Sequence, residues 1–297
     1  MSTAPSANPS DDLLVHPYNN PKSPLYLGQG SFVKACEAKK LLKALRPCSV
    51  DLMLIDPPYF EITKDSWDCQ WSGEMAYVAW LVDHLKWASQ ALKPNGSLLM
   101  FGGIGKDRSH PLFDVMKDVE RLTKLTYRNM ITWKKRRGYG KSHDYLFCRE
   151  EIVWYSASAE RTEVTFNIPL LDVKRGYAGW DPKHPAKSEF KRVSNVWDDI
   201  PELMRPKRNC QKPEPLIQRL IETHSNPGDL VVDFFAGYGT TGIVALKLGR
   251  RFVGCEAIVD DARDADARCG FALHHRVVEK EKEDVDGCEA CADETDA

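Results

Sequence analysis

The stretch that decides the fold is VDLMLI at Val50–Ile55, which DPPY at Asp56–Tyr59 follows directly. Its apolar residues predict a buried strand, and open α/β sheets bind ligands at the carboxyl ends of such strands. Pro57 and Pro58 fix the backbone φ and remove two N–H donors, so the loop is stiff and its carbonyls stay free to accept. The carboxylate, the carbonyls and the aromatic face predict a cup for a flat ring with an exocyclic amine. For this motif alone, a turn that merely ends the strand is the alternative.

A second motif lies far downstream, between a strand predicted at Leu230–Ala236 and a helix predicted at Ile243–Leu248. It reads GYGTTG at Gly237–Gly242, and its glycines allow a tight turn and a close approach of the backbone to a ligand. A further strand is predicted at Arg251–Cys255, and the acidic Glu256 that follows it can accept hydrogen bonds from ribose hydroxyls. These features predict a nucleoside-binding loop.

Read literally, the glycine loop is GxGxxG, so an NAD-dependent oxidoreductase is one alternative. Little chain follows Glu256, however, and most of it is charged. A dinucleotide fold needs two mononucleotide-binding halves. The sequence therefore favours a ligand with a single adenosine.

Together, DPPY at Asp56–Tyr59 and FxGxG at Phe235–Gly239 resemble the paired motifs of the amino-methylating DNA methyltransferases. The catalytic motif comes before the cofactor motif, which is the permuted order of the β group. The resemblance covers about residues 25–258 and includes further pieces in the expected order at Leu92–Leu99, Ile131–Lys134 and Gln211–Pro213. It implies an α/β, Rossmann-like methyltransferase fold that depends on S-adenosylmethionine, with circularly permuted motifs and a small target-recognition insertion.

The resemblance also implies roles for single residues. Asp56 and the Pro57 carbonyl would accept the N–H groups of the target amine, and Tyr59 would stack on a base flipped out of the duplex. Glu256 would hold the ribose of S-adenosylmethionine, and Lys212 would approach its methionine carboxylate. The catalytic set is Asp56, Pro57, Pro58 and Tyr59, and the cofactor-binding set is Gln29, Lys212, Asp233, Phe235, Gly237, Gly239, Thr240, Thr241 and Glu256.

Composition and resemblance divide the chain into five parts. We expect a flexible arm at 1–24, the catalytic half of the methyltransferase domain at 25–156 and a target-recognition region at 157–209. The cofactor-binding half follows at 210–275, and an acidic, disordered tail is expected at 276–297.

Charge is unevenly distributed along the chain, whose net charge is −2. Residues 279–297 hold nine acids and two lysines, a net charge of −7, so the remainder carries +5. A basic loop is predicted after the strand that contains Trp133, and such residues suit contacts with DNA phosphates. The expected DNA-binding residues are Lys134, Lys135, Arg136, Arg137, Tyr139, Lys141 and Arg175.

The predicted target is adenine N6, because family members with Asp in the catalytic motif mostly act on adenine, whereas those with Ser mostly act on cytosine N4. Cytosine N4, RNA as the substrate, and a catalytically silent binding module are the alternatives. DNA is the expected partner, and a homodimer is a second expected assembly, for which Trp80 and Trp87 offer a contact face.

No metal is expected, and a zinc site that involves Cys288 and Cys291 is the weaker alternative. No apolar run reaches the ~18 residues that a membrane span needs, so no membrane partner is expected. These features predict a cytoplasmic, nucleoid-associated protein.

Overall fold

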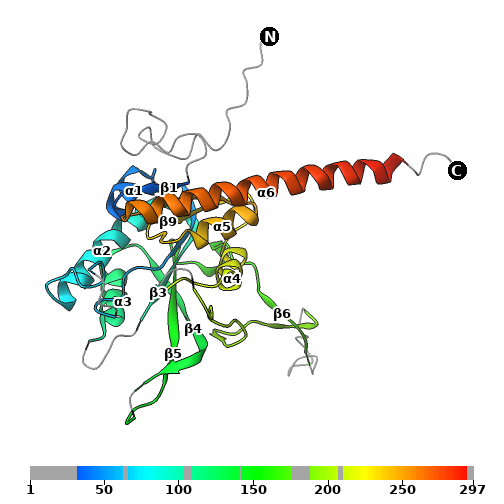
Figure 1. Ribbon diagram of the computed structural model, residues 1–297. Helices are drawn as coiled ribbons and strands as arrows, with labels where there is room; N and C mark the ends of the chain where they lie inside the picture. Colours follow the sequence, from blue (N-terminus) through cyan, green and yellow to red (C-terminus); the bar gives the residue numbers. More distant parts are fainter. Residues whose placement is uncertain are drawn as a thin grey trace.

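The computed structural model describes residues 32–62, 66–103, 109–140, 142–175, 188–206 and 210–292, with side chains up to residue 276. Its centre is an eight-stranded sheet in the order β1-β10-β9-β2-β3-β5-β4-β8 (Figure 1). The strands from β1 to β3 in this order are parallel, and β5 runs antiparallel between β3 and β4. The strands are β1 (Val33–Ala35), β2 (Val50–Ile55), β3 (Leu92–Gly102), β4 (Thr126–Tyr139), β5 (Phe147–Ser156), β8 (Val196–Trp197), β9 (Leu230–Asp233) and β10 (Arg251–Glu256).

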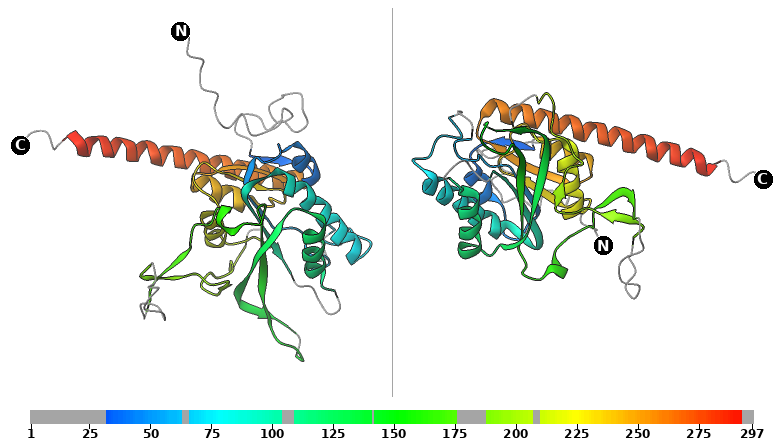
Figure 2. Two further views of the ribbon diagram at one scale, coloured as in Figure 1. Left: turned by 180° about the vertical axis from the view of Figure 1, so that it is seen from behind. Right: turned by 90° about the horizontal axis from the view of Figure 1, so that it is seen from below.

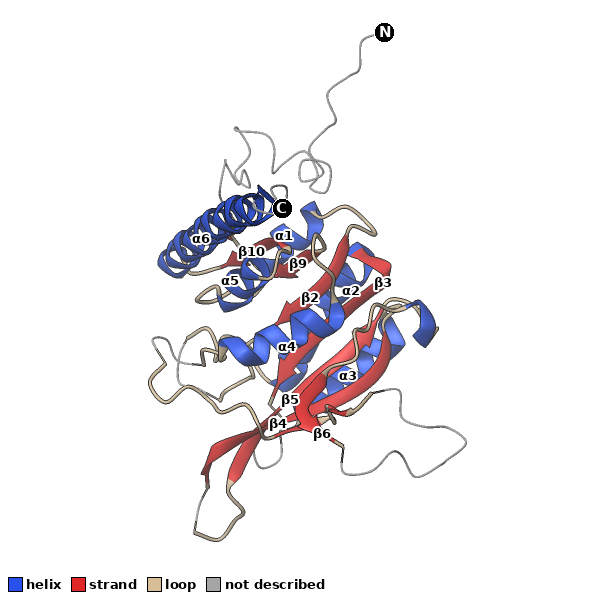
Figure 3. Cartoon of the chain, turned by 90° about the vertical axis from the view of Figure 1, so that its right-hand side faces the viewer, coloured by secondary structure: helices blue, strands red, loops and turns tan. Residues whose placement is uncertain are grey.

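Helices cover both faces of this sheet, which gives three layers (Figure 3). One face packs against α1, α2 and α3, and the other packs against α4, α5 and α6. The bounds are α1 (Ala38–Ala44), α2 (Glu74–Ala91), α3 (Pro111–Leu122), α4 (Glu214–His224), α5 (Thr240–Lys247) and α6 (Val259–Ala292).

Strand β2 shows why its sequence is almost wholly apolar. Every residue of the strand is buried, because helices cover both of its faces. Met53 and Ile55 point into the core on the side of α2, whereas Leu52 and Leu54 point into the core on the side of α4 and α5. Such strands read as continuous hydrophobic runs rather than as alternating ones. The strand predicted at Val50–Ile55 is confirmed at the same bounds.

The two sequence motifs meet at the centre of the sheet. Strand β2 pairs with β9 in parallel, with Leu52 opposite Val231. From β2 the chain crosses to β3 on one side, whereas from β9 it crosses to β10 on the other. This change of direction is a topological switch point, where open α/β sheets bind their ligands. Both predicted loops therefore open at one place, although about 180 residues separate them in the chain.

The region 157–209 leaves the central layers, as its irregular composition predicts. It contains the short helix η2 (Arg161–Glu163), the two-stranded sheet of β6 (Leu170–Lys174) and β7 (Phe190–Arg192), and the edge strand β8. Figures 1 and 2 show β6 extending away from the body of the domain. The side-chain amide of Asn167 donates to the carbonyls of Glu222 and Ser225, which fixes the start of this region against the end of α4.

The tail differs from the disorder expected at 276–297, because the backbone of α6 stays helical to Ala292 (Figure 2). Ala, Glu and Lys, which are frequent in this segment, are strong helix formers, so a helix needs no apolar packing pattern there. The side chains of Cys288 and Cys291 lie outside the described ones. Among the residues that the structure describes, no helix is long and apolar enough to cross a membrane.

Candidate active site

A cleft of about 1700 Å³ opens at the carboxyl ends of β2 and β9. Residues from both sequence motifs line it, together with residues from the β4–β5 hairpin and from the segment before α4. The predicted catalytic set of Asp56, Pro57, Pro58 and Tyr59 and the predicted cofactor residues Lys212, Asp233, Phe235, Gly237, Thr240, Thr241 and Glu256 all lie on its wall.

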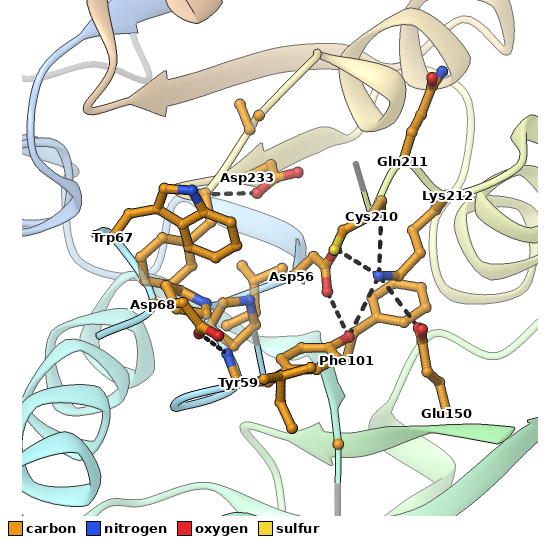
Figure 4. Close-up of a pocket in the computed structure, with 18 of the residues that line it drawn as sticks. Asp56, Tyr59, Trp67, Asp68, Phe101, Glu150, Cys210, Gln211, Lys212 and Asp233 are labelled. Atoms are coloured by element: carbon orange, nitrogen blue, oxygen red, sulfur yellow. Dashed lines mark hydrogen bonds and ion pairs between the residues drawn. The ribbon is translucent and has the colours of Figure 1, made fainter. Parts of the chain in front are cut away.

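Asp56 is the first residue after β2, and its carboxylate is fully engaged. Its Oδ1 accepts from the Tyr59 hydroxyl at 2.7 Å, and its Oδ2 accepts from Lys212 Nζ at 2.6 Å (Figure 4). Burial raises the pKa of Asp56, and the nearby ammonium of Lys212 opposes that rise. The site therefore holds an acceptor group whose charge depends on its basic neighbour.

The proline loop is stiff, but one of its carbonyls is not free as predicted. The Pro58 carbonyl accepts from the Tyr77 hydroxyl at 2.7 Å, because α2 presents that side chain beneath the loop. The backbone N–H of Tyr59 donates to Asp68 Oδ1 at 3.0 Å. These two contacts leave the Pro57 carbonyl as the backbone acceptor of the motif with which a substrate can bond.

The glycine loop is shaped by two backbone positions with positive φ, Gly237 at 49° and Gly239 at 79°. Gly237 donates its N–H to Glu256 Oε2 at 3.0 Å, which joins the loop to the end of β10. Asp233 supports the loop from below, since its carboxylate accepts from the Phe235 N–H at 3.0 Å and from the Thr241 hydroxyl at 2.7 Å. Burial raises the pKa of Asp233 to about 7.

An aromatic wall connects the catalytic loop to the glycine loop. Trp80 packs against Phe235 at a centroid distance of 5.6 Å and against Trp71 at 4.9 Å. Trp80 is thus committed to the cleft, and Trp87 packs partly buried against the core with Lys43 above its ring. The proposed dimer face on α2 is therefore wrong, because the fold itself occupies both tryptophans.

These residues fit an S-adenosyl compound. The glycine loop leaves backbone exposed to the cleft, Glu256 provides an acceptor for hydroxyl groups at its edge, and Phe235 provides an apolar surface between this loop and Asp56. Helix α5 begins at Thr240, so its free N–H groups lie beside the same cleft. The predicted contact of Gln29 with the adenine ring lies outside the described residues.

Lys212 is not where the resemblance suggested. It was expected beside a methionine carboxylate, but its Nζ lies between Asp56 and Glu150, at 2.6 and 3.2 Å from their carboxylate oxygens. A buried ammonium needs paired anions, and this corner of the cleft supplies two. Glu150 was missed from the sequence, because an acidic pair at Glu150 and Glu151 on a strand carries no distinctive spacing.

The basic segment after Trp133 is a strand and not the predicted loop, since β4 continues to Tyr139 and pairs with β5. Lys135 and Tyr139 line the cleft, and Lys134, Arg136 and Arg137 are exposed along the same strand. Glu202 accepts from the backbone N–H groups of Arg136 and Arg137, which fastens the strand to the segment before α4.

The two other predicted DNA contacts lie elsewhere. Arg175 follows β6, and its Nε donates to the Phe190 carbonyl at 2.9 Å, so part of its guanidinium holds the small sheet together. Lys141 is outside the described residues. DNA contact by either residue stays a prediction.

The sheet order and the cleft at its switch point define a Rossmann-like methyltransferase. A family described as DNA methylase matches residues 50–262. The chain belongs to this family of N6 and N4 DNA methylases, and the predicted fold and enzyme class are confirmed.

Two curated relatives illustrate the likeness in sequence. The chain is 28% identical over 272 residues to the type II methyltransferase M2.DpnII of Streptococcus pneumoniae, which covers 82% of this chain and 89% of that protein. It is 29% identical over 257 residues to the DNA adenine methyltransferase YhdJ of Escherichia coli K12, which covers 81% of this chain and 83% of the relative.

Two solved structures illustrate the likeness in fold. The cytosine-N4-specific PvuII DNA methyltransferase aligns with a TM-score of 0.62 at 17% identity, over 80% of this chain and 85% of its own. A DNA modification methylase of Thermus thermophilus, TTHA0409, was solved in complex with S-adenosyl-L-methionine. It aligns with a TM-score of 0.55 at 25% identity, over 80% of this chain and 92% of its own.

Proposed function

We infer that this protein methylates the exocyclic N6 amine of an adenine in DNA and takes the methyl group from S-adenosylmethionine. The observation that carries this inference is the shared cleft, in which the Asp56 loop and the glycine loop open side by side at the switch point. The relative YhdJ, named as a DNA adenine methyltransferase, supports adenine as the target base. Cytosine N4 is the alternative, because the Asp56 cup can hold either amine.

The cofactor site of this proposal runs along the glycine loop. Glu256 accepts from the ribose hydroxyls, Phe235 packs beside the methionine part, and the exposed backbone at Gly237 allows close approach. S-adenosylmethionine supplies a methyl group on a positively charged sulfur. The chain has to hold that group against the cup of Asp56 and keep water away, and the aromatic wall of Trp80 and Phe235 serves both needs.

The chemistry of the cup follows from its acceptors. The adenine amine is a weak nucleophile because the ring shares its lone pair. When the Asp56 carboxylate and the Pro57 carbonyl accept its two N–H bonds, the lone pair localises on the nitrogen and faces the cofactor side. Positioning of this kind supplies much of the acceleration. Asp56 or water then accepts the proton that leaves. The Tyr59 ring supports the flipped base.

DNA is the proposed macromolecular partner, because a target base must leave the duplex to reach Asp56. The exposed basic side chains of β4 lead from the protein surface to the cleft mouth, where Tyr139 stands. Such cations bind phosphates and set affinity rather than sequence choice. The sheet of β6 and β7 is the proposed reader of base edges.

Nucleoside analysis tests this function directly. The protein is incubated with labelled S-adenosylmethionine and unmethylated duplex DNA, and the digested nucleosides are identified by mass spectrometry. N6-methyladenine is the expected product. N4-methylcytosine would overturn the base assignment and keep the chemistry, whereas methyl transfer to RNA alone would replace DNA as the substrate.

The basic strand carries a separate prediction. Changing Arg136 and Arg137 to Gln should weaken binding equally for all duplex sequences, because phosphate contacts carry no sequence information. Removing two phosphate contacts should lower the slope of log K against log salt by about 1.8. Fluorescence anisotropy at several salt concentrations measures both quantities. Arg121→Gln is the matched control, since Arg121 is exposed on α3 and outside the cleft, and an equal loss in that variant would contradict the assignment.

A further inference from the structure

A buried lysine stands between two carboxylates at the catalytic cup. Lys212 has a side-chain exposure of only 7%, and its Nζ lies 2.6 Å from Asp56 Oδ2 and 3.2 Å from Glu150 Oε2 (Figure 4). The Tyr59 hydroxyl is 3.4 Å from the same nitrogen, and the ring of Phe101 lies beneath it at 4.9 Å. Lys212 is therefore fixed from several sides, and both carboxylates are within its reach without movement of the backbone.

Glu150 belongs to a longer chain of alternating charges. It lies on β5, and its second oxygen, Oε1, pairs with Lys135 of β4, whose ammonium also stands over the Trp133 ring. The order is Asp56, Lys212, Glu150, Lys135, so each inner group has two partners of opposite sign. Glu150 can therefore keep its position while Lys212 exchanges one contact for another.

The substrate needs an acceptor that Lys212 now occupies. Both Asp56 oxygens are engaged, one by the Tyr59 hydroxyl and one by Lys212. An incoming amine that donates to Asp56 must displace one of them. Lys212 can give way without leaving a bare charge in a buried place, because Glu150 is already 3.2 Å from it.

We propose that Lys212 and Glu150 form a positioning pair for the methyl-transfer reaction. Lys212 keeps the carboxylate of Asp56 ionised and oriented in the open cup, and Glu150 receives the ammonium when the target amine takes its place. The proposal rests on the proposed function, since it assigns a substrate amine to Asp56. It gives both residues a role through Asp56 and not through contact with the reacting atoms.

The two neighbours act on the charge of Asp56 in opposite directions. Burial raises the pKa of Asp56, the ammonium of Lys212 lowers it, and the carboxylate of Glu150 raises it. Lys212→Met therefore raises this pKa further, and Glu150→Gln lowers it. Among the described residues, the other titratable groups that interact with Asp56 are Tyr59, Tyr77, Cys210 and Asp233. None of them changes in either variant, so the opposite signs isolate the pair.

The experiment measures kcat/KM for DNA against pH in the full-length protein. An acidic limb is expected where Asp56 becomes protonated. In Lys212→Met this limb should move to higher pH by about one unit, and in Glu150→Gln it should move to lower pH. Lys212→Arg should keep the limb near that of the parent protein, because the charge is retained. Lys247→Met is the matched control, since its partner Glu214 lies on the surface and the limb should not move.

A direct readout separates this proposal from the proposed function. Carboxyl 13C NMR of Asp56, assigned by its loss in Asp56→Asn, reports the pKa of Asp56 whether or not the protein methylates DNA. Opposite shifts in the two variants support the pair even if the substrate proves different. Equal limbs and equal NMR pKa values in all variants would overturn it. Loss of activity in Lys212→Met without any shift would make Lys212 a merely structural residue.

Discussion

Asp56→Asn should reduce kcat/KM for DNA methylation by about 10³-fold or more and leave cofactor affinity nearly unchanged. The substitution removes the charged acceptor for the target amine but conserves the volume of the side chain. It also turns an amide N–H toward Lys212 or toward the Tyr59 hydroxyl, where the native carboxylate only accepts. Cofactor affinity should survive, because Glu256 and the glycine loop belong to other strands than Asp56.

The measurement is a single-turnover methylation rate, combined with calorimetry for S-adenosylmethionine. Asp199→Asn is the matched control: Asp199 has an ion pair of its own, with Arg219, at a place outside the cleft. That variant should methylate DNA at the rate of the parent protein. A rate above about a tenth of the parent in Asp56→Asn would contradict the role of this carboxylate, since an acid–base group typically contributes 10²-fold or more.

The sequence was informative where one short segment carries the whole signal. DPPY follows an apolar run, and the glycine loop follows another, so the residues alone place both loops at strand ends. The rule that ligands bind at a switch point then placed the cleft. That prediction held because β2 and β9 are neighbours, and their apolar residues are buried on both faces.

Residues that depend on tertiary pairing were not predictable in this way. Lys212 and Asp56 are 156 positions apart, and no local pattern announces that β5 will add Glu150 as a third partner. The basic segment was read as a loop because Lys, Arg and Gly are poor strand formers. Pairing with β5, in which Lys134 lies opposite Arg149 and Tyr139 opposite Phe147, overrides that propensity.

Gly239→Ala should destabilise the protein by about 3 kcal/mol and abolish the thermal stabilisation that S-adenosylmethionine provides. Gly239 has φ of 79°, a region that L-residues adopt only with strain. A Cβ there would lie 2.9 Å from Ala265 Cβ and 3.1 Å from Ala265 Cα, so helix α6 would have to move. Because Gly239 caps the start of α5, that movement would also displace the N–H groups at Thr240 from the cleft.

Urea unfolding and a thermal shift with cofactor measure the two effects separately. Gly270→Ala is the matched control, because it makes the same change inside α6 at a position where a Cβ would meet nothing within 4 Å. Alanine is the better helix former, so this variant should gain about 0.5–1 kcal/mol and keep its response to cofactor. If both variants behaved alike, the conformation of the glycine loop would not control binding. If Gly239→Ala lost stability and kept the cofactor response, the loop would support the fold without shaping the cofactor site.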